Sequence, residues 1–87
     1  MNYQAKHLKS SYNINIGVFM EIFGIRVKQE LKQQNKKQVD LAKYLNVQKS
    51  TLSEWLNNNN EPSMKAIVDI AIFLNVSTDY LLGLDNN

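Results

Sequence analysis

The chain of 87 residues contains no cysteine, only three glycines and a single histidine, His7. The lack of cysteine excludes disulfide bonds and thiolate metal sites. One histidine, scattered carboxylates and no glycine-rich phosphate loop do not make up a metal site or a catalytic acid–base pair. These absences argue against an enzyme and against any bound cofactor or metal.

Long apolar runs are also lacking, and the longest are about five residues, as in residues 16–20. A helix that crosses a membrane needs ~20 consecutive apolar residues, so no membrane span is expected. The first residues include Lys6, His7 and Lys9, but no apolar core of signal-peptide length follows them before Gly17. We therefore expect a cytoplasmic protein.

Charge is distributed unevenly along the chain, although the net charge is only +2. Residues 26–49 contain seven Lys or Arg and two acids, a net charge of +5. Residues 50–87 contain one lysine and five acids, a net charge of −4. One half of the domain is therefore expected to face a polyanion. A merely solvated basic helix would account for the charge equally well.

Apolar residues recur with helical spacing and predict an all-α fold in one small domain. Asn35, Asn46 and Asn75 each follow an expected helix, where asparagine tolerates the left-handed conformation that ends helices. Ser63 and Ser77 stand in cap positions before the last two. The five helices are expected at residues 22–34, 38–45, 49–56, 63–74 and 77–82.

The first twenty residues differ in pattern from the rest of the chain. We expect an N-terminal arm over 1–20, the helical domain over 21–84 and a tail over 85–87. Apolar Ile14, Ile16 and Val18 alternate with Asn or Gly within residues 10–19, which is a weak strand signal. The arm could be a loosely ordered extension, or it could touch DNA or a second copy, and Met20 could be an alternative translation start.

The most informative segment is residues 38–56, QVDLAKYLNVQKSTLSEWL. It predicts two short helices joined by a tight turn. Ala42 supplies the small residue that two steeply crossing helices need, and Asn46 tolerates the positive φ of the turn. Apolar residues at 41, 45, 47, 52 and 55 would bury the pair against its neighbours. This pattern is typical of a helix-turn-helix, and it favours that motif over a generic helical hairpin.

The sequence resembles the repressor/Cro-type, XRE-like helix-turn-helix family over residues 23–83. The matching motifs are FGIRVK at 23–28, QVDLA at 38–42, LNVQKSTLSEWLN at 45–57, EPS at 61–63 and LNVSTDYLLG at 74–83. The resemblance implies a five-helix, lambda-repressor-like DNA-binding domain whose third helix lies in the major groove. The implied function is a transcriptional regulator, expected to be a repressor. Lys36 and Lys37 depart from the pattern by replacing an apolar residue and a Ser/Thr cap, and Gln48 replaces a second cap.

Polar residues on the expected third helix are candidates for reading bases. Leu52, Trp55 and Leu56 are expected to face inward, which leaves a set of donors and acceptors facing outward. That set is Gln48, Lys49, Ser50, Thr51 and Glu54. Thr51 could instead serve the helix locally, and Glu54 could be a plain surface acid.

The resemblance assigns base reading to Lys49, Ser50 and Glu54. It assigns phosphate contacts to Gln38 and Asn57, and Lys37 and Asn59 are expected to join them.

The expected partner is a double-stranded DNA operator bound by a homodimer, because one recognition helix reads too few base pairs. The arm is one candidate interface, and the other is the apolar C-terminal set, which could instead close the monomer core: Tyr80, Leu81, Leu82 and Leu84. The alternative function is an antitoxin or another protein-interaction module built on the same domain. A protein partner of antitoxin or antirepressor type is compatible with either function.

Overall fold

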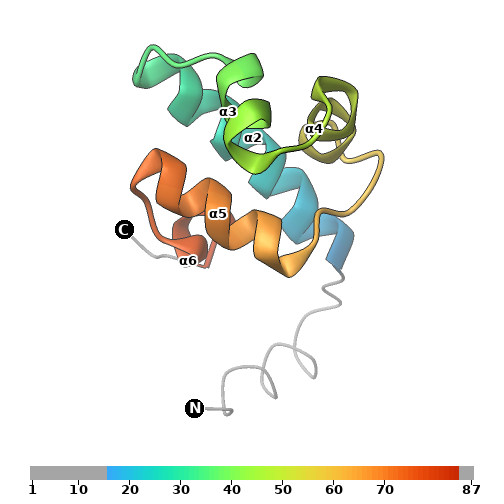
Figure 1. Ribbon diagram of the computed structural model, residues 1–87. Helices are drawn as coiled ribbons and strands as arrows, with labels where there is room; N and C mark the ends of the chain where they lie inside the picture. Colours follow the sequence, from blue (N-terminus) through green and yellow to red (C-terminus); the bar gives the residue numbers. More distant parts are fainter. Residues whose placement is uncertain (1–15, 85–87) are drawn as a thin grey trace, which may run out of the picture.

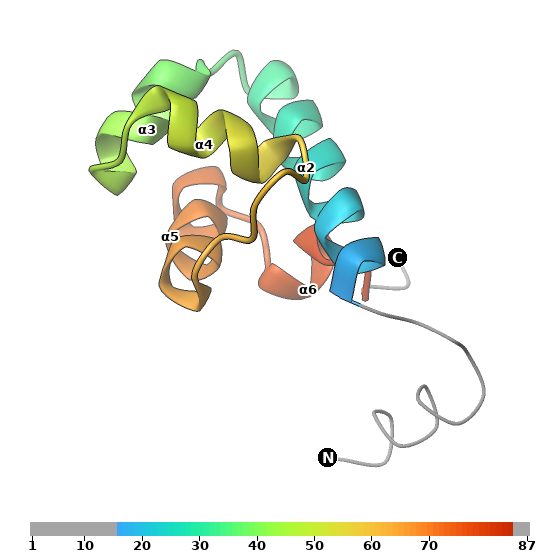
Figure 2. The same cartoon turned by 90° about the vertical axis from the view of Figure 1, so that its right-hand side faces the viewer.

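The computed structural model describes residues 16–84, which form five helices and no strand (Figure 1). The helices are α2 (Ile16–Gln33), α3 (Gln38–Leu45), α4 (Lys49–Leu56), α5 (Met64–Leu74) and α6 (Thr78–Leu81). The long α2 contacts α4, α5 and α6, while α3 contacts α4 and α5. In Figure 2, α4 crosses in front of α2, with α5 and α6 below it. The all-α expectation is confirmed.

The first helix begins at Ile16, six residues before the expected start at residue 22. Phe19 and Met20 are neighbours in sequence, yet both pack on the core, which is possible on a helix but not on two opposite faces of a strand. The strand signal is therefore wrong for residues 16–19, and its remaining residues, 10–15, lie outside the described part. Helix α2 crosses residue 20, where the sequence pattern suggested a boundary between arm and domain.

The ends of α2, α3 and α5 are closed by asparagine. Asn35, Asn46 and Asn75 all have φ near +60°, as their positions in the sequence predict. After each, the next backbone N–H donates to a carbonyl five residues earlier, for example Val47 N to Ala42 O at 3.0 Å. The N–H of each asparagine itself donates to the carbonyl three residues earlier. Together the two bonds satisfy carbonyls that a helix end would otherwise leave without partners. The short connections that result keep consecutive helices close together.

The helix starts are of two kinds. Ser63 Oγ accepts from Ala66 N and Ser77 Oγ accepts from Tyr80 N, so α5 and α6 have the serine caps that the sequence predicts. The cap residues of α3 and α4 are Lys37 and Gln48, and neither side chain makes a cap hydrogen bond. The two helices of the central motif therefore begin with no side chain bonded to their first amides.

The core lies where α2 meets α4, α5 and α6, and α3 adds Leu41 and Ala42 to it. The expected inward residues of α2, Phe23, Val27 and Leu31, are buried, and Met20 extends their stripe by one turn. Leu81 is fully buried and therefore closes the monomer core, so it cannot belong to an exposed dimer surface. The buried core residues are Met20, Phe23, Val27, Leu31, Leu41, Ala42, Leu52, Leu56, Ile70, Ala71, Leu74 and Leu81.

None of the helices within residues 16–84 combines the length and the apolar character that a membrane crossing needs.

Candidate nucleic-acid interface

The segment from α3 to α4 forms two eight-residue helices joined at Asn46. Asn46 adopts φ 59° and ψ 43°, and its N–H donates to carbonyls of α3, which ends that helix abruptly. Ala42 and Leu52 are buried where the two helices meet the core. The left-handed turn thus redirects the chain within a few residues, and α4 lies on the outside of the domain (Figure 2).

A close approach between backbones sets the position of α4 on α2. A Cβ atom built at Gly24 would lie 2.9 Å from the carbonyl carbon of Leu56 and closer still to the carbonyl oxygen. Real Cβ atoms essentially never come within 3.0 Å of another group. Only glycine therefore allows α2 to touch the last turn of α4 in this way. Gly24 lies inside the FGIRVK motif, but its role depends on a contact that periodicity does not reveal.

The expected base-reading residues lie together at the start of α4 and one turn later. Gln48, Lys49 and Ser50 are exposed, and Thr51 is half-buried. Ser50 Oγ donates to Gln48 Oε1 at 3.5 Å, so these two side chains lie side by side. Glu54 is exposed, and its Oε1 accepts from Asn60 Nδ2 at 3.1 Å. The first turn of α4 therefore presents donors and acceptors to solvent, and Glu54 is oriented by the following loop.

The expected phosphate-binding residues lie at two different helix ends. Lys37 and Gln38 are at the start of α3, where Lys37 is exposed and Gln38 half-buried. Asn57 and Asn59 follow α4 and are both exposed. Asn59 N donates to Glu54 O at 2.8 Å, which folds the loop back over the end of α4. The described geometry thus places one pair at the start of α3 and the other just beyond α4.

A basic residue that the sequence analysis did not single out lies beside Asn57. Lys28 Nζ, on α2, donates to Asn57 Oδ1 at 2.5 Å. Asn57 Nδ2 in turn donates to Ser53 Oγ at 3.2 Å, so the amide is held from both sides. This contact joins residues 29 positions apart, and the only sequence signal for it is that Lys28 follows Gly24 by one helical turn. The structure therefore adds an exposed cation next to an expected phosphate contact.

Two of the basic residues counted in the positive segment face the C-terminal helices instead. The guanidinium of Arg26 lies 4.6 Å from the centre of the Tyr80 ring and donates to the Tyr80 carbonyl. Lys36 Nζ lies 4.7 Å from the centre of the Phe73 ring and donates to Phe73 O at 3.0 Å. Lys36 thus brings a cation to the C-terminal end of α5, where the helix dipole favours it. Both residues stabilise packing, and the charge count overstates the cations available to a polyanion.

A small polar cluster surrounds Tyr80 on the same side. Tyr80 Oη donates to Glu30 Oε2 at 3.0 Å, next to the stacked Arg26. The pKa of Tyr80 is raised above its ordinary value, mainly by partial burial and to a smaller extent by this hydrogen bond and by the charge of the Glu30 carboxylate. These contacts tie α6 to the middle of α2.

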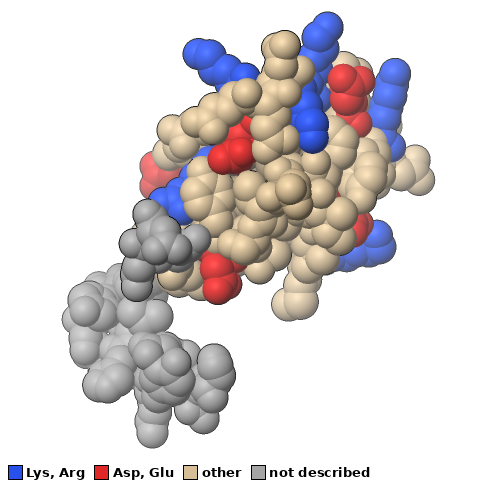
Figure 3. All heavy atoms as spheres, turned by 90° about the vertical axis from the view of Figure 1, so that its left-hand side faces the viewer, with Lys and Arg blue, Asp and Glu red and all other residues tan. Residues whose placement is uncertain are grey.

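Figure 3 shows the side of the molecule that lies at the left of Figure 1. Lys and Arg side chains project mainly from the upper part of this side, with acidic side chains between them. Figure 3 is turned by 90° about the vertical axis from Figure 1, and at the corresponding height Figure 1 shows the end of α2 and helix α3. Among residues 16–84 no group of three or more His, Cys, Asp or Glu side chains could hold a metal ion. Around α3 and α4 the exposed charged residues are four lysines and two acids, so this surface has an excess of cations: Lys28, Lys37, Lys43, Lys49, Asp40 and Glu54.

A family model described as helix-turn-helix matches residues 27–81, which is more than half of the chain. The match covers α3, α4 and the turn between them, together with α5, α6 and residues 27–33 of α2. Neither the curated proteins nor the solved structures contain a match to this chain.

Proposed function

The chain belongs to the Cro/XRE-type helix-turn-helix family of DNA-binding regulators, and on that premise we propose that it represses transcription by binding a specific double-stranded operator. The observation that carries the proposal is the exposed polar first turn of α4, directed outward by the left-handed turn at Asn46. A protein bound to its operator blocks the access of other proteins to that DNA, and we therefore propose repression as the mode of regulation. Such a protein acts where its DNA is, so a cytoplasmic location accompanies the proposal.

In this proposal α4 enters the major groove and its first turn reads base edges. Lys49 can donate to guanine O6 and N7, and Ser50 can donate or accept. Glu54 can accept from cytosine N4, and its bond to Asn60 holds it near one position before DNA arrives. Gln48 and Thr51 flank these residues. The hydrogen bond from Ser50 Oγ to Gln48 Oε1 supports a contact of both side chains with the same base pair.

Phosphates would be held on both sides of the groove. Gln38 and Lys37 would bind one backbone at the start of α3, and Asn57 and Asn59 the other beyond α4. The starts of α3 and α4 lack side-chain caps, so their first amides can donate to phosphate oxygens. Lys28 joins the second group through its contact with Asn57.

Two copies of the domain would bind one operator. A single recognition helix contacts too few base pairs to specify a site among a genome's competing sequences. A two-fold pair places two α4 helices in successive major grooves, about 34 Å apart.

The proposal is tested by selecting bound sequences from a random duplex pool with the full chain. Lys49→Ala and Ser50→Ala should change the selected sequence, with a loss of roughly 1–3 kcal/mol at the affected base pair. Gln38→Ala and Asn57→Ala should weaken binding to all sequences, and affinity should fall by about 0.9 log unit per bound phosphate per log unit of salt.

Lys32→Ala serves as the control, because it removes an exposed cation that belongs to neither set. It should leave the selected sequence unchanged. If Lys49→Ala and Ser50→Ala also select the wild-type sequence, another surface reads the DNA. A protein that binds no duplex at any salt concentration would instead favour a protein-interaction module of the antitoxin type.

A further inference from the structure

Helix α5 is apolar on nearly all sides. Among its eleven residues, MKAIVDIAIFL, only Lys65 and Asp69 carry charge. One side is buried in the domain core, through Ala66, Ile70 and neighbouring positions. A helix that is apolar all round is normally covered all round, because its exposed side otherwise keeps apolar surface in water. Residues 16–84, the part of the chain that the structure describes, cover only one side of α5.

The uncovered side carries Met64, Val68 and Ile72, four residues apart along the helix, which we name the α5 stripe. Their side chains are 81%, 43% and 62% exposed, respectively. The stripe runs beside a groove of about 420 Å³, whose apolar lining includes Met20 and Leu82. Contiguous exposed apolar surface of this kind marks interaction sites.

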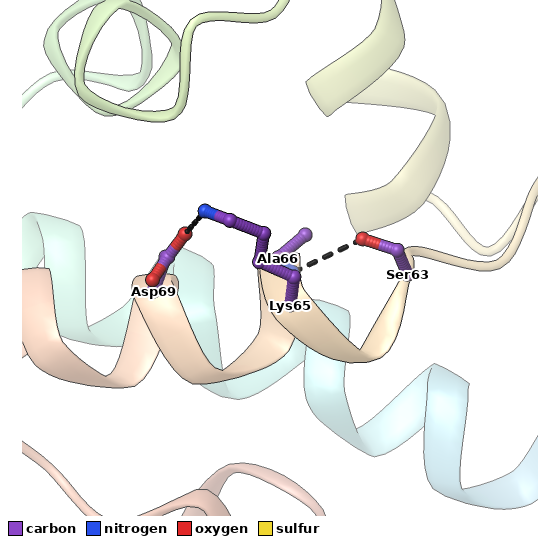
Figure 4. Close-up of polar contacts among 4 residues, drawn as sticks. All are labelled: Ser63, Lys65, Ala66 and Asp69. Carbon is purple, nitrogen blue, oxygen red and sulfur yellow. Dashed lines mark hydrogen bonds and ion pairs between the residues drawn. The ribbon is translucent and has the colours of Figure 1, made fainter.

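The charges beside the stripe indicate which partner fits. Lys65 and Asp69 lie on one flank, and Lys65 Nζ donates to Asp69 Oδ2 at 2.6 Å (Figure 4). A lysine at its ordinary pKa is already charged at neutral pH, and the hydrogen bond with Asp69 raises the pKa of Lys65 further. In an antiparallel pair of α5 helices related by a two-fold axis at Val68, Met64 of one copy opposes Ile72 of the other. The same symmetry brings Lys65 toward Asp69 of the second copy, on both sides of the axis.

We propose that the α5 stripe is the surface through which two copies of this chain associate, packed antiparallel across a two-fold axis. The apolar stripe can pack against its own copy, and the flank that carries Lys65 and Asp69 is complementary to itself in charge, as an isologous interface requires. This inference rests on the proposed function only in that it names the interface of the operator-bound dimer, and it is tested without DNA.

The first test compares Val68→Glu with Ile25→Glu by sedimentation equilibrium of the full chain. Ile25 is a matched control because it is, like Val68, an exposed β-branched aliphatic residue on a helix, at 50%, but it lies on α2 outside the groove beside the stripe. Wild type and Ile25→Glu should dimerise, whereas Val68→Glu should raise the dimer Kd about 100-fold or more, because it buries two like charges at the axis. A dimer that Val68→Glu leaves unchanged overturns the proposal.

The second test uses charge and does not depend on changing the apolar stripe. Lys65→Glu makes the flank acidic and Asp69→Lys makes it basic, so each variant alone should dimerise more weakly than wild type. Mixed in equal amounts, the two variants should form a heterodimer, because an acidic flank then faces a basic flank. Mixed variants that stay as weakly associated as each variant alone would show that this flank does not face a second copy.

Other occupants of the stripe give different results. A wild-type chain that remains monomeric at high concentration overturns the proposal. If an apolar dye then binds α5 only after residues 1–15 are deleted, the chain's own N-terminal segment covers the stripe. DNA selection by such a monomer would leave the proposed function standing, so the two proposals fail separately.

Discussion

Replacing Gly24 by alanine tests how α4 is positioned. The added Cβ would lie 2.9 Å from the carbonyl carbon of Leu56, whereas ordinary contact begins at 3.4 Å. Relief requires a movement of at least 0.5 Å, the difference between the two, and more for the closer oxygen. The obstructing group is backbone at the end of α4, so no side-chain rotation can relieve it. Either α4 moves away from α2, or α2 bends.

Two opposing effects determine the change in unfolding free energy. Alanine is favoured over glycine inside a helix by about 1 kcal/mol. Overpacking in a close contact costs about 1–3 kcal/mol, and occasionally more when backbone must shift. Because Gly24 meets backbone, we expect the upper part of that range and a net loss of about 2 kcal/mol. For a domain of this size that loss lowers the melting temperature by roughly 8–16 °C.

Thermal unfolding followed by circular dichroism measures the loss, with Gln29→Ala as the control. Gln29 is an exposed position on the same helix, so that variant reports helix propensity without a clash. At a temperature where both variants are folded, Gly24→Ala should also bind the selected operator more weakly, because the end of α4 is displaced. A melting temperature equal to or above that of the wild type would refute the reasoning, since it would mean that α4 yields at no cost.

Two further predictions concern the helix start of α5 and the cluster around α6. Ser63→Ala removes the hydrogen bond that Ser63 Oγ accepts from Ala66 N (Figure 4), and it should lower the unfolding free energy by ~1 kcal/mol. Gln48→Ala, at an N-cap without such a bond, should change the unfolding free energy little. Equal effects of the two variants in urea denaturation would contradict this prediction. Because the pKa of Tyr80 is raised in the folded chain, its contribution is complete below the unfolded value near pH 10 and is lost as the pH rises through the folded value. The unfolding free energy of Tyr80→Phe should therefore fall less above pH 10 than that of the wild type, and parallel curves would exclude the role of this phenol.

Local features of the chain were predicted well because their causes are local. The stripe of Phe23, Val27 and Leu31 needs only helical spacing, and it is buried as expected. Asn46 takes the left-handed conformation because its side chain tolerates it and because the helix before it needs an end. Ser63 caps α5 by a bond within four residues. The positions of the candidate base-reading residues at the start of α4 follow from the same local pattern, and their contacts with DNA stay a prediction.

The start of α2 shows how a short window can mislead. Ile16 and Val18 satisfy a period of two, but a window of ten residues cannot separate that period from one end of an amphipathic helix. What decides the conformation is the burial of Met20 and Phe23 against the rest of the domain. Packing thus extended the helix beyond the point that the sequence pattern indicated.

By itself the sequence determined the helices and the helix-turn-helix motif, and it determined the helix ends apart from the start of α2, since each of these depends on residues within a few positions of one another. Only the tertiary structure decided which surfaces remain available. It brought Gly24 against Leu56 and Lys36 against Phe73, and it left the α5 stripe uncovered while it buried Leu81. Lys36 and Phe73 are 37 positions apart, and no periodicity links them. Such contacts depend on how whole helices pack, because the free energy of burial belongs to the assembled core and not to any one segment.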